Sequence, residues 1–291
     1  MADGQRLFVK VTRESLPQVK DKYPFLYLER GRLEVDDSSI KWIDASNHVV
    51  PLPVATLNAL LLGPGTSITH DAVRTTTAAN CSICWVGEDS LLFYAAGFLP
   101  TADTRNLKRQ IELATDAEQS LAVARRMFAR RFPDADLKGR TLQEMMGMEG
   151  HRVRALYQAM AEKYQVGWKG RSFTPGKFET SDLTNQVLTS SNAALYGLLC
   201  SAIHSMGYSP HIGFIHSGSP LPFVYDMADI YKEHLCIDLA FSLTRELAGR
   251  YDKHKVADAF RKRVLEMNLL EKIGTDMAAF FGVGRARRAG E

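Results

Sequence analysis

Hydrophobic residues in the first hundred positions either alternate with polar residues or gather in short apolar runs, and both patterns are typical of β-strands. The alternation predicts half-buried strands and the continuous runs predict buried ones, at 25–28, 33–35, 40–43, 57–62, 83–86 and 91–94. A turn at 30–32 separates the first two strands, and Gly31 suits it because glycine tolerates a positive φ. The pattern therefore predicts a small, mainly β region.

The hydrophobic spacing becomes helical in the rest of the chain. A short helix at 71–79 follows the break at 63–65 and has Thr69 as a suitable N-cap. Beyond residue 104 the apolar residues recur every three or four positions, and Thr141 with Glu144 has the spacing of a capping box. The pattern predicts five long helices, at 104–132, 141–165, 182–206, 223–248 and 254–281.

Strands and helices are segregated along the chain, which predicts an α+β fold. We expect a β domain over 1–98, a linker over 99–104, a helical catalytic domain over 105–281 and a disordered basic tail over 282–291. A length of 291 residues agrees with two domains. The chain contains no apolar run of roughly 18 residues and no apolar signal core at its start, so we expect a cytoplasmic protein with no membrane contact.

The four cysteines have the pattern of core residues. Cys81 and Cys84 have C-x-x-C spacing, but Cys200 and Cys236 are too far apart to complete a zinc site. The first pair also adjoins an apolar run at 83–86. Reduced, buried thiols are therefore a better interpretation of these cysteines than a zinc or redox site.

Basic residues are concentrated outside the β region. Residues 1–100 hold nine Lys/Arg against eleven Asp/Glu, so the rest of the chain carries a surplus of about five positive charges within a net +3. Phe173 and Phe178 alternate with cations in a polar loop, a pattern that suits base stacking beside phosphate contacts. Solvated helix faces remain the alternative for many of these cations, which are Arg125, Arg126, Arg130, Arg131, Lys169, Arg171, Lys177, Arg261, Lys262 and Arg263.

Glu149 is a carboxylate within the apolar stripe of the helix predicted at 141–165. A carboxylate that faces a core is unfavourable unless it is paired or bound to a cation. An ion pair with Arg152 or Arg154 would explain it without any function. Gly147 and Gly150 flank it, and such glycines in a helix indicate the close approach of another backbone or of a ligand.

One histidine and three acidic residues could accompany Glu149. His216 ends an apolar segment and enters a Gly/Ser/Pro loop, while Asp226, Asp229 and Glu233 form one acidic ridge on the next helix. Taken separately, a structural histidine and a solvated acidic face are the simpler explanations. Taken with Glu149, two carboxylates and one imidazole suit Mg²⁺ or Mn²⁺ better than structural Zn²⁺.

The ordered motifs resemble the CRISPR adaptation endonuclease/integrase family, the first of the CRISPR-associated (Cas) proteins, and are most similar to its type I-E branch. The resemblance covers nearly the whole chain and rests on segments at 64–66, 70–74, 85–88, 147–154, 182–186, 213–216 and 223–229. It implies that Glu149, His216 and Asp229 bind a divalent metal, Mg²⁺ or Mn²⁺, and that Asp226 supports the site. It also implies a homodimer formed through the β domains, bound to the small second adaptation protein and to a short DNA duplex with splayed ends.

DNA contacts are expected from the resemblance and from the basic segments together: Arg74, Arg152, Arg154, Lys169, Arg171, Phe173, Phe178, Tyr196, Tyr225, Arg261 and Arg263. The sequence departs from the branch at Arg30, which replaces an aromatic residue that caps the duplex end in relatives. Relatives often carry basic residues in place of Ser67, Leu92 and Ser219.

The function expected from the resemblance is insertion of the 3′ ends of short foreign duplexes into the CRISPR repeat array, by metal-assisted phosphodiester transfer. A stand-alone nuclease that hydrolyses branched DNA is an alternative from the same enzyme class. A non-catalytic DNA-binding scaffold, in which Glu149 and Asp229 only pair with arginines, is an alternative from another class.

Overall fold

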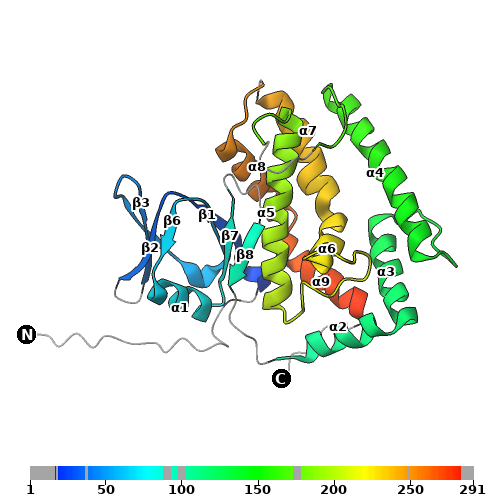
Figure 1. Cartoon of the computed structure of the whole chain (residues 1–291), viewed down its shortest axis with the longest axis horizontal. Coiled ribbons are helices and arrows are strands. Elements are labelled where there is room, and N and C mark those ends of the chain that lie inside the picture. The colour runs from blue at the N-terminus through cyan, green and yellow to red at the C-terminus, as the bar shows by residue number, and fades with distance from the viewer. Residues whose placement is uncertain are drawn as a thin grey trace, which may run out of the picture.

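The computed structural model describes residues 17, 19–36, 39–87, 93–97, 103–172, 178–247 and 249–282. Strands lie on one side of the molecule and most helices on the other, with the long helix α5 (Leu183–Ser205) between them (Figure 1). The α+β fold predicted from the sequence is therefore confirmed, with the β region preceding the helices along the chain.

Two four-stranded sheets form the β region. The first has the order β1-β5-β7-β8, in which β1, β5 and β7 are parallel and β8 runs antiparallel to β7. The second has the order β4-β3-β2-β6. The bounds are β1 Tyr23–Leu28, β2 Gly31–Asp36, β3 Ser39–Asp44, β4 Val49–Leu52, β5 Leu57–Leu62, β6 Thr66–Ile68, β7 Ser82–Val86 and β8 Phe93–Gly97.

The predicted strands are present, with local corrections. All six residues of β5 are buried, as their continuous apolar run predicts. Tyr94 is 63% exposed, so the last strand is not a buried one, and Leu91 and Leu92 lie outside the described residues. The short helix α1 (His70–Ala78) begins as expected, because the Thr69 hydroxyl accepts a hydrogen bond from the backbone of Ala72.

The turn before β2 uses glycine for packing rather than for a positive φ. Arg30 has the left-handed conformation (φ 56°), while Gly31 is already part of β2. A Cβ at Gly31 would lie 2.4 Å from both the Ile43 carbonyl oxygen and the Trp42 ring. Glycine is therefore required there by the close approach of β3.

Eight helices follow the β region in the described residues. Three of the predicted long helices are divided. The first is divided at Asp116, and the fourth contains a π-helical turn (η5, Glu233–Ile237). The fifth is divided at Asn268, whose φ is +48°. Their bounds are α2 Arg105–Thr115, α3 Ala117–Arg131, α4 Leu142–Tyr164, α5 Leu183–Ser205, α6 Pro222–Lys232, α7 Asp238–Glu246, α8 Lys253–Glu266 and α9 Leu269–Phe281. Among the described residues of the β region, 3₁₀ turns occur at η2 (Val19–Asp21) and η3 (Val54–Thr56).

The largest hydrophobic core joins the first sheet to the helices. Phe25, Leu61 and Val86 from the sheet belong to the same buried cluster as residues of α3, α5 and α6. Ser201 on α5 adds a polar link, since its hydroxyl donates to the Asn58 carbonyl at 3.1 Å and lies 2.7 Å from the Ser82 hydroxyl. Helix α5 is thus a fixed support for α6, which carries the predicted acidic ridge.

The structure also places the four cysteines and part of the predicted linker. All four cysteines are buried and free, as predicted, and burial raises the pKa of the Cys81 and Cys200 thiols to about 12. Among the described helices, none has both the length and the hydropathy needed to cross a membrane. The predicted linker is described only from residue 103, and the predicted tail lies outside the described residues beyond Gly282.

Candidate metal centre and nucleic-acid interface

The loop that carries His216 is folded around a buried carboxylate. Asp226, on the second turn of α6, is 1% exposed and accepts backbone N–H bonds from Phe214 (2.6 Å), Ile215 (3.1 Å) and His216 (2.8 Å). A Cβ at Gly213 would lie 3.0 Å from the Asp226 carboxylate and 2.8 Å from the His216 carbonyl oxygen. The first position of the Gly-Phe-Ile-His segment must therefore be glycine for the loop to close.

The same carboxylate orients the imidazole of His216. Nδ1 of His216 lies 2.8 Å from Asp226 Oδ1, and Nε2 lies 3.7 Å from Asp229 Oδ2. The hydrogen bond with Asp226 and the nearby charge of Asp229 raise the pKa of His216, although burial acts in the opposite direction. An Nδ1–H donor to Asp226 leaves Nε2 as the nitrogen that faces the other site residues.

Glu149 reaches this cluster through a cation from the preceding helix. Arg131, the last residue of α3, contacts Glu149 Oε1 through Nη1, and the same nitrogen lies 3.6 Å from Asp229 Oδ2. The side chains of Arg131, Glu149 and Asp229 are 13%, 16% and 14% exposed. The ion pair expected from the sequence, with Arg152 or Arg154, was wrong: the partner comes from α3.

Lys232 is a second cation that the sequence analysis missed. Its Nζ lies 2.7 Å from Asp229 Oδ1 and 5.1 Å from the centre of the Tyr196 ring. Burial disfavours its charged form, yet Asp229 and Tyr196 together outweigh burial and raise the pKa of Lys232. The signal was the i, i+3 spacing from Asp229, which places the two side chains on one face of α6.

The two predicted carboxylate ligands have opposite pKa shifts. Burial raises the pKa of Glu149, with a further contribution from the charge of Asp229 against the opposing effect of Arg131. Burial also disfavours the charged form of Asp229, but Lys232 and Arg131 outweigh it and lower the pKa of Asp229. Arg131 thus contacts both partly buried carboxylates, and Lys232 adds a second positive charge beside Asp229.

The donor set fits Mg²⁺ or Mn²⁺ in kind. Glu149, Asp229 and His216 Nε2 would supply the oxygen and imidazole donors that such ions accept. In the described part of the chain, no three His, Cys, Asp or Glu side chains stand ready to enclose an ion. Arg131 Nη1 contacts both predicted carboxylate ligands, Glu149 and Asp229.

The two glycines beside Glu149 do not mark a backbone contact. No described atom lies within 4 Å of a Cβ built at Gly147, and the nearest to one at Gly150 is Arg154 Nη1 at 3.6 Å. The expectation of a close backbone approach was therefore wrong. The face of α4 next to Glu149 is open at Gly147, which leaves the second expectation, a ligand, compatible with the fold.

Two tyrosines lie beside the acidic cluster, as the resemblance implied. Tyr196 on α5 and Tyr225 on α6 pack edge to face with ring centres 5.1 Å apart. The Tyr225 ring centre is 6.0 Å from that of His216. Both residues are partly exposed, and their role in lining the site stays a prediction.

Some of the expected DNA contacts are exposed. Arg154 and Lys169 are exposed, and Arg74 on α1 is exposed but paired with Asp71 at 3.2 Å. The guanidinium of Arg152 lies 5.0 Å from the centre of the Phe132 ring. These positions agree with a role in DNA binding, which stays a prediction.

Other expected DNA contacts are engaged within the protein. Arg171 donates to Asn185 at 2.9 Å and to Thr189 at 3.0 Å, which fixes the loop to α5. Arg263 donates to Asp238 at 2.7 Å, beside the π turn. Phe178 packs edge-on against Tyr251 with ring centres 5.0 Å apart, and Arg261 pairs with Asp258. Phe173, another expected contact, lies outside the described residues.

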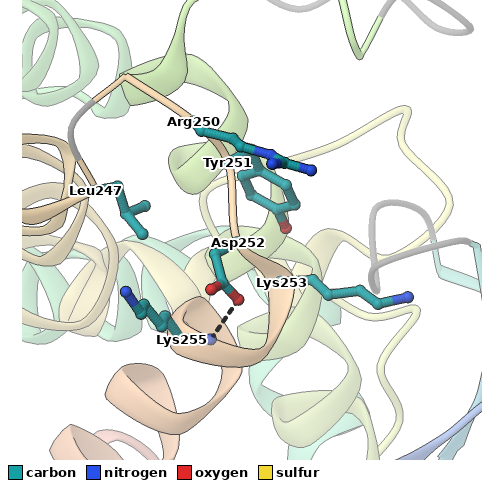
Figure 2. A pocket seen from close by; sticks show the side chains of 6 residues that line it. All are labelled: Leu247, Arg250, Tyr251, Asp252, Lys253 and Lys255. Atoms are coloured by element: carbon teal, nitrogen blue, oxygen red, sulfur yellow. Dashed lines mark hydrogen bonds between the residues drawn. The ribbon is translucent and has the colours of Figure 1, made fainter.

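A basic pocket between α7 and α8 was not anticipated from the sequence. It has a volume of about 520 Å³ and is lined by Leu247, Arg250, Tyr251, Asp252, Lys253 and Lys255 (Figure 2). Asp252 accepts the backbone N–H of Lys255 at 3.1 Å, and Lys253 forms an ion pair with Glu29 on the β side. None of the lining residues belongs to the acidic cluster, so this pocket is a separate cationic surface.

Of the described departures from the family pattern, Arg30 and Ser67 lie in the β region, whereas Ser219 is three residues after His216 in the same loop. Arg30 forms the left-handed turn before β2, and Ser67 lies in β6. The Ser219 hydroxyl is buried with no hydrogen-bond partner among the described residues, and Leu92 lies outside them.

The chain is similar to known proteins in sequence and in fold. Residues 128–268 match the family model described as CRISPR associated protein Cas1. A CRISPR-associated endonuclease Cas1 of Chlorobaculum tepidum is 66% identical over 277 residues, which cover 95% of this chain and 94% of that protein. The crystal structure of a TtCas1–DNA complex is 37% identical, covers 92% of this chain and 100% of the other, and has a TM-score of 0.67. The fold alone is shared with a Cas1 protein from Thermotoga maritima, which has 15% identity and a TM-score of 0.74 over 92% of this chain and 99% of that one.

Proposed function

Since this chain belongs to the Cas1 family of CRISPR-associated endonucleases, we propose that it is a divalent-metal-dependent integrase that joins the 3′ ends of short DNA duplexes to a CRISPR repeat array. The observation that carries the proposal is the convergence of Glu149, His216 and Asp229, from α4, a loop and α6, on one partly buried cluster. The donor types suit phosphodiester chemistry with Mg²⁺ or Mn²⁺.

Each residue of the cluster has a part in this chemistry. Glu149, Asp229 and His216 Nε2 would hold the metal ion, and the bound ion would supply Lewis-acid stabilisation of the charge on the target phosphate. Asp226 holds His216 Nδ1 and the loop backbone, so it presents Nε2 to the site. The incoming 3′-hydroxyl forms one phosphodiester as another breaks, so no nucleotide energy source is required.

DNA is the proposed substrate, and two features support it. A relative with 37% identity, TtCas1, was crystallised with DNA. In this chain, exposed cations occur on α4 and in the loop after it, and the pocket of Figure 2 adds Arg250 and Lys255. We further propose the homodimer, the assembly with the small second adaptation protein, membership of the type I-E-like branch and a cytoplasmic location.

A joining assay tests the proposal. The protein, its small partner, a short duplex with free 3′ ends, a supercoiled repeat-bearing plasmid and Mg²⁺ or Mn²⁺ are incubated together, and joined product is measured. Cleaved but unjoined DNA would favour the stand-alone nuclease. DNA binding with neither product, and with no uptake of Mn²⁺, would favour the non-catalytic scaffold.

The exposed cation Lys169 and the engaged cation Arg263 are expected to respond differently to substitution. Lys169→Gln should weaken duplex binding and reduce the slope of log K against log salt by about 1, because one phosphate contact is lost. The melting temperature of this variant should not change.

Arg263→Gln should lower the melting temperature by a few degrees, because the Arg263 guanidinium joins α8 to Asp238 and Ser242. Binding isotherms at several salt concentrations and thermal melts measure both. An unchanged salt slope for Lys169→Gln would remove that residue from the interface.

A further inference from the structure

Arg131 differs from the other arginines of its helix in what it contacts. The other three bond elsewhere: Arg125 to the Arg140 carbonyl, Arg126 to the Phe280 carbonyl and Arg130 to Asp276. Arg131 instead contacts the carboxylates of Glu149 and Asp229. The basic segment that the sequence suggests as one surface is therefore divided, and its last member belongs to the acidic cluster.

The guanidinium occupies a position that a divalent ion would also need. One nitrogen, Nη1, faces both carboxylates, and these come from different helices, α4 and α6. The guanidinium carbon also lies 4.9 Å from the centre of the Phe132 ring. A guanidinium keeps its charge at any physiological pH, so it cannot leave by deprotonation. It can only be displaced.

We infer that Arg131 is an internal counter-ion that holds Glu149 and Asp229 together in the metal-free protein, and that a divalent ion must displace it to bind. This inference rests on the proposed function, because it assumes that the two carboxylates are metal ligands. Arg131 would therefore control the affinity for the metal ion. Without the ion, the guanidinium offsets the repulsion between the two carboxylates. During metal binding, it competes with the ion for the same carboxylate oxygens. Arg131 is thus a positioning residue for the ligands.

The test compares Arg131→Gln with the matched control Arg130→Gln, which changes the adjacent arginine of α3 outside the cluster. Mn²⁺ binding is measured by calorimetry on the full chain, and thermal melts are recorded with and without Mn²⁺. In Arg131→Gln we expect Mn²⁺ to bind about tenfold more tightly than in the parent, because nothing is displaced. We also expect its metal-free melting temperature to fall by about 5 °C, and Mn²⁺ to recover most of that loss. Arg130→Gln should keep the Mn²⁺ affinity of the parent.

The possible outcomes separate this inference from the proposed function. Equal or weaker Mn²⁺ binding by Arg131→Gln, with uptake by the parent intact, overturns the inference alone. No specific uptake by either protein overturns the inference and the metal-dependent function together. If Arg131→Gln does not fold, Arg131→Lys replaces it: a compact ammonium cannot reproduce the planar guanidinium contact, so Mn²⁺ should again bind more tightly. Unchanged affinity in that variant also contradicts the inference.

Discussion

Glu149→Gln is expected to lower the rate of strand joining by about a thousandfold or more, while duplex binding stays within about twofold of the parent. Glutamine keeps the shape of the side chain but not the negative charge that a divalent ion requires. The Gly147 side of α4 is open and the basic surfaces are untouched, so DNA affinity has no reason to fall. Joined product is measured in single-turnover assays, and duplex binding by fluorescence anisotropy.

A matched control comes from the same helix. Glu162→Gln removes an exposed carboxylate of α4 whose visible contact is a hydrogen bond from Gln158. Its joining rate should equal that of the parent. Joining by Glu149→Gln at the parental rate would show that the carboxylate has no part in the chemistry, and the scaffold alternative would then gain support.

Asp226→Ala is expected to lower the free energy of unfolding by about 3–5 kcal/mol. The carboxylate is buried and accepts three backbone N–H groups in addition to its contact with His216 Nδ1. Its removal leaves these donors without an acceptor in a dry environment. The variant should also lose strand joining at temperatures where it is folded, because His216 loses the group that orients it.

Urea denaturation followed by circular dichroism measures this change, with Asp258→Ala as the control. Asp258 is an exposed carboxylate of α8 that pairs with Arg261, so its loss should cost under about 1 kcal/mol. A similarly small cost for Asp226→Ala would mean that the loop does not depend on the carboxylate and that the fold of the site has been misunderstood.

Local signals in the sequence predicted the starts of two helices. Thr69 caps α1 by accepting the backbone N–H of Ala72, and Thr141 and Glu144 form the expected capping box of α4. The helix breaks were harder to predict. Asp116 lies in an otherwise periodic segment, and the π turn at Glu233–Ile237 has no break in its apolar spacing. Such irregularities depend on packing between helices, and π turns often occur beside functional sites.

The site could be predicted only in part, because its charges are balanced by distant residues. Apolar surroundings pointed to Glu149 and His216, and the family resemblance selected Asp229 from the acidic ridge. The structure brings these three together. The partner of Glu149 was predicted among neighbours on the same helix, whereas the actual partner, Arg131, is on α3. Nothing in the local sequence separates Arg131 from Arg130; the packing of α3 against α4 and α6 makes that choice.

The most direct test of the account is the anomalous diffraction of Mn²⁺ in crystals of the full chain soaked in the metal. The account predicts one peak bounded by Glu149, Asp229 and His216 Nε2, at roughly 2.1 Å from its ligands, with the Arg131 guanidinium moved away from both carboxylates. A site without any peak at saturating Mn²⁺, with the contact between Arg131 and Glu149 still in place, would contradict it.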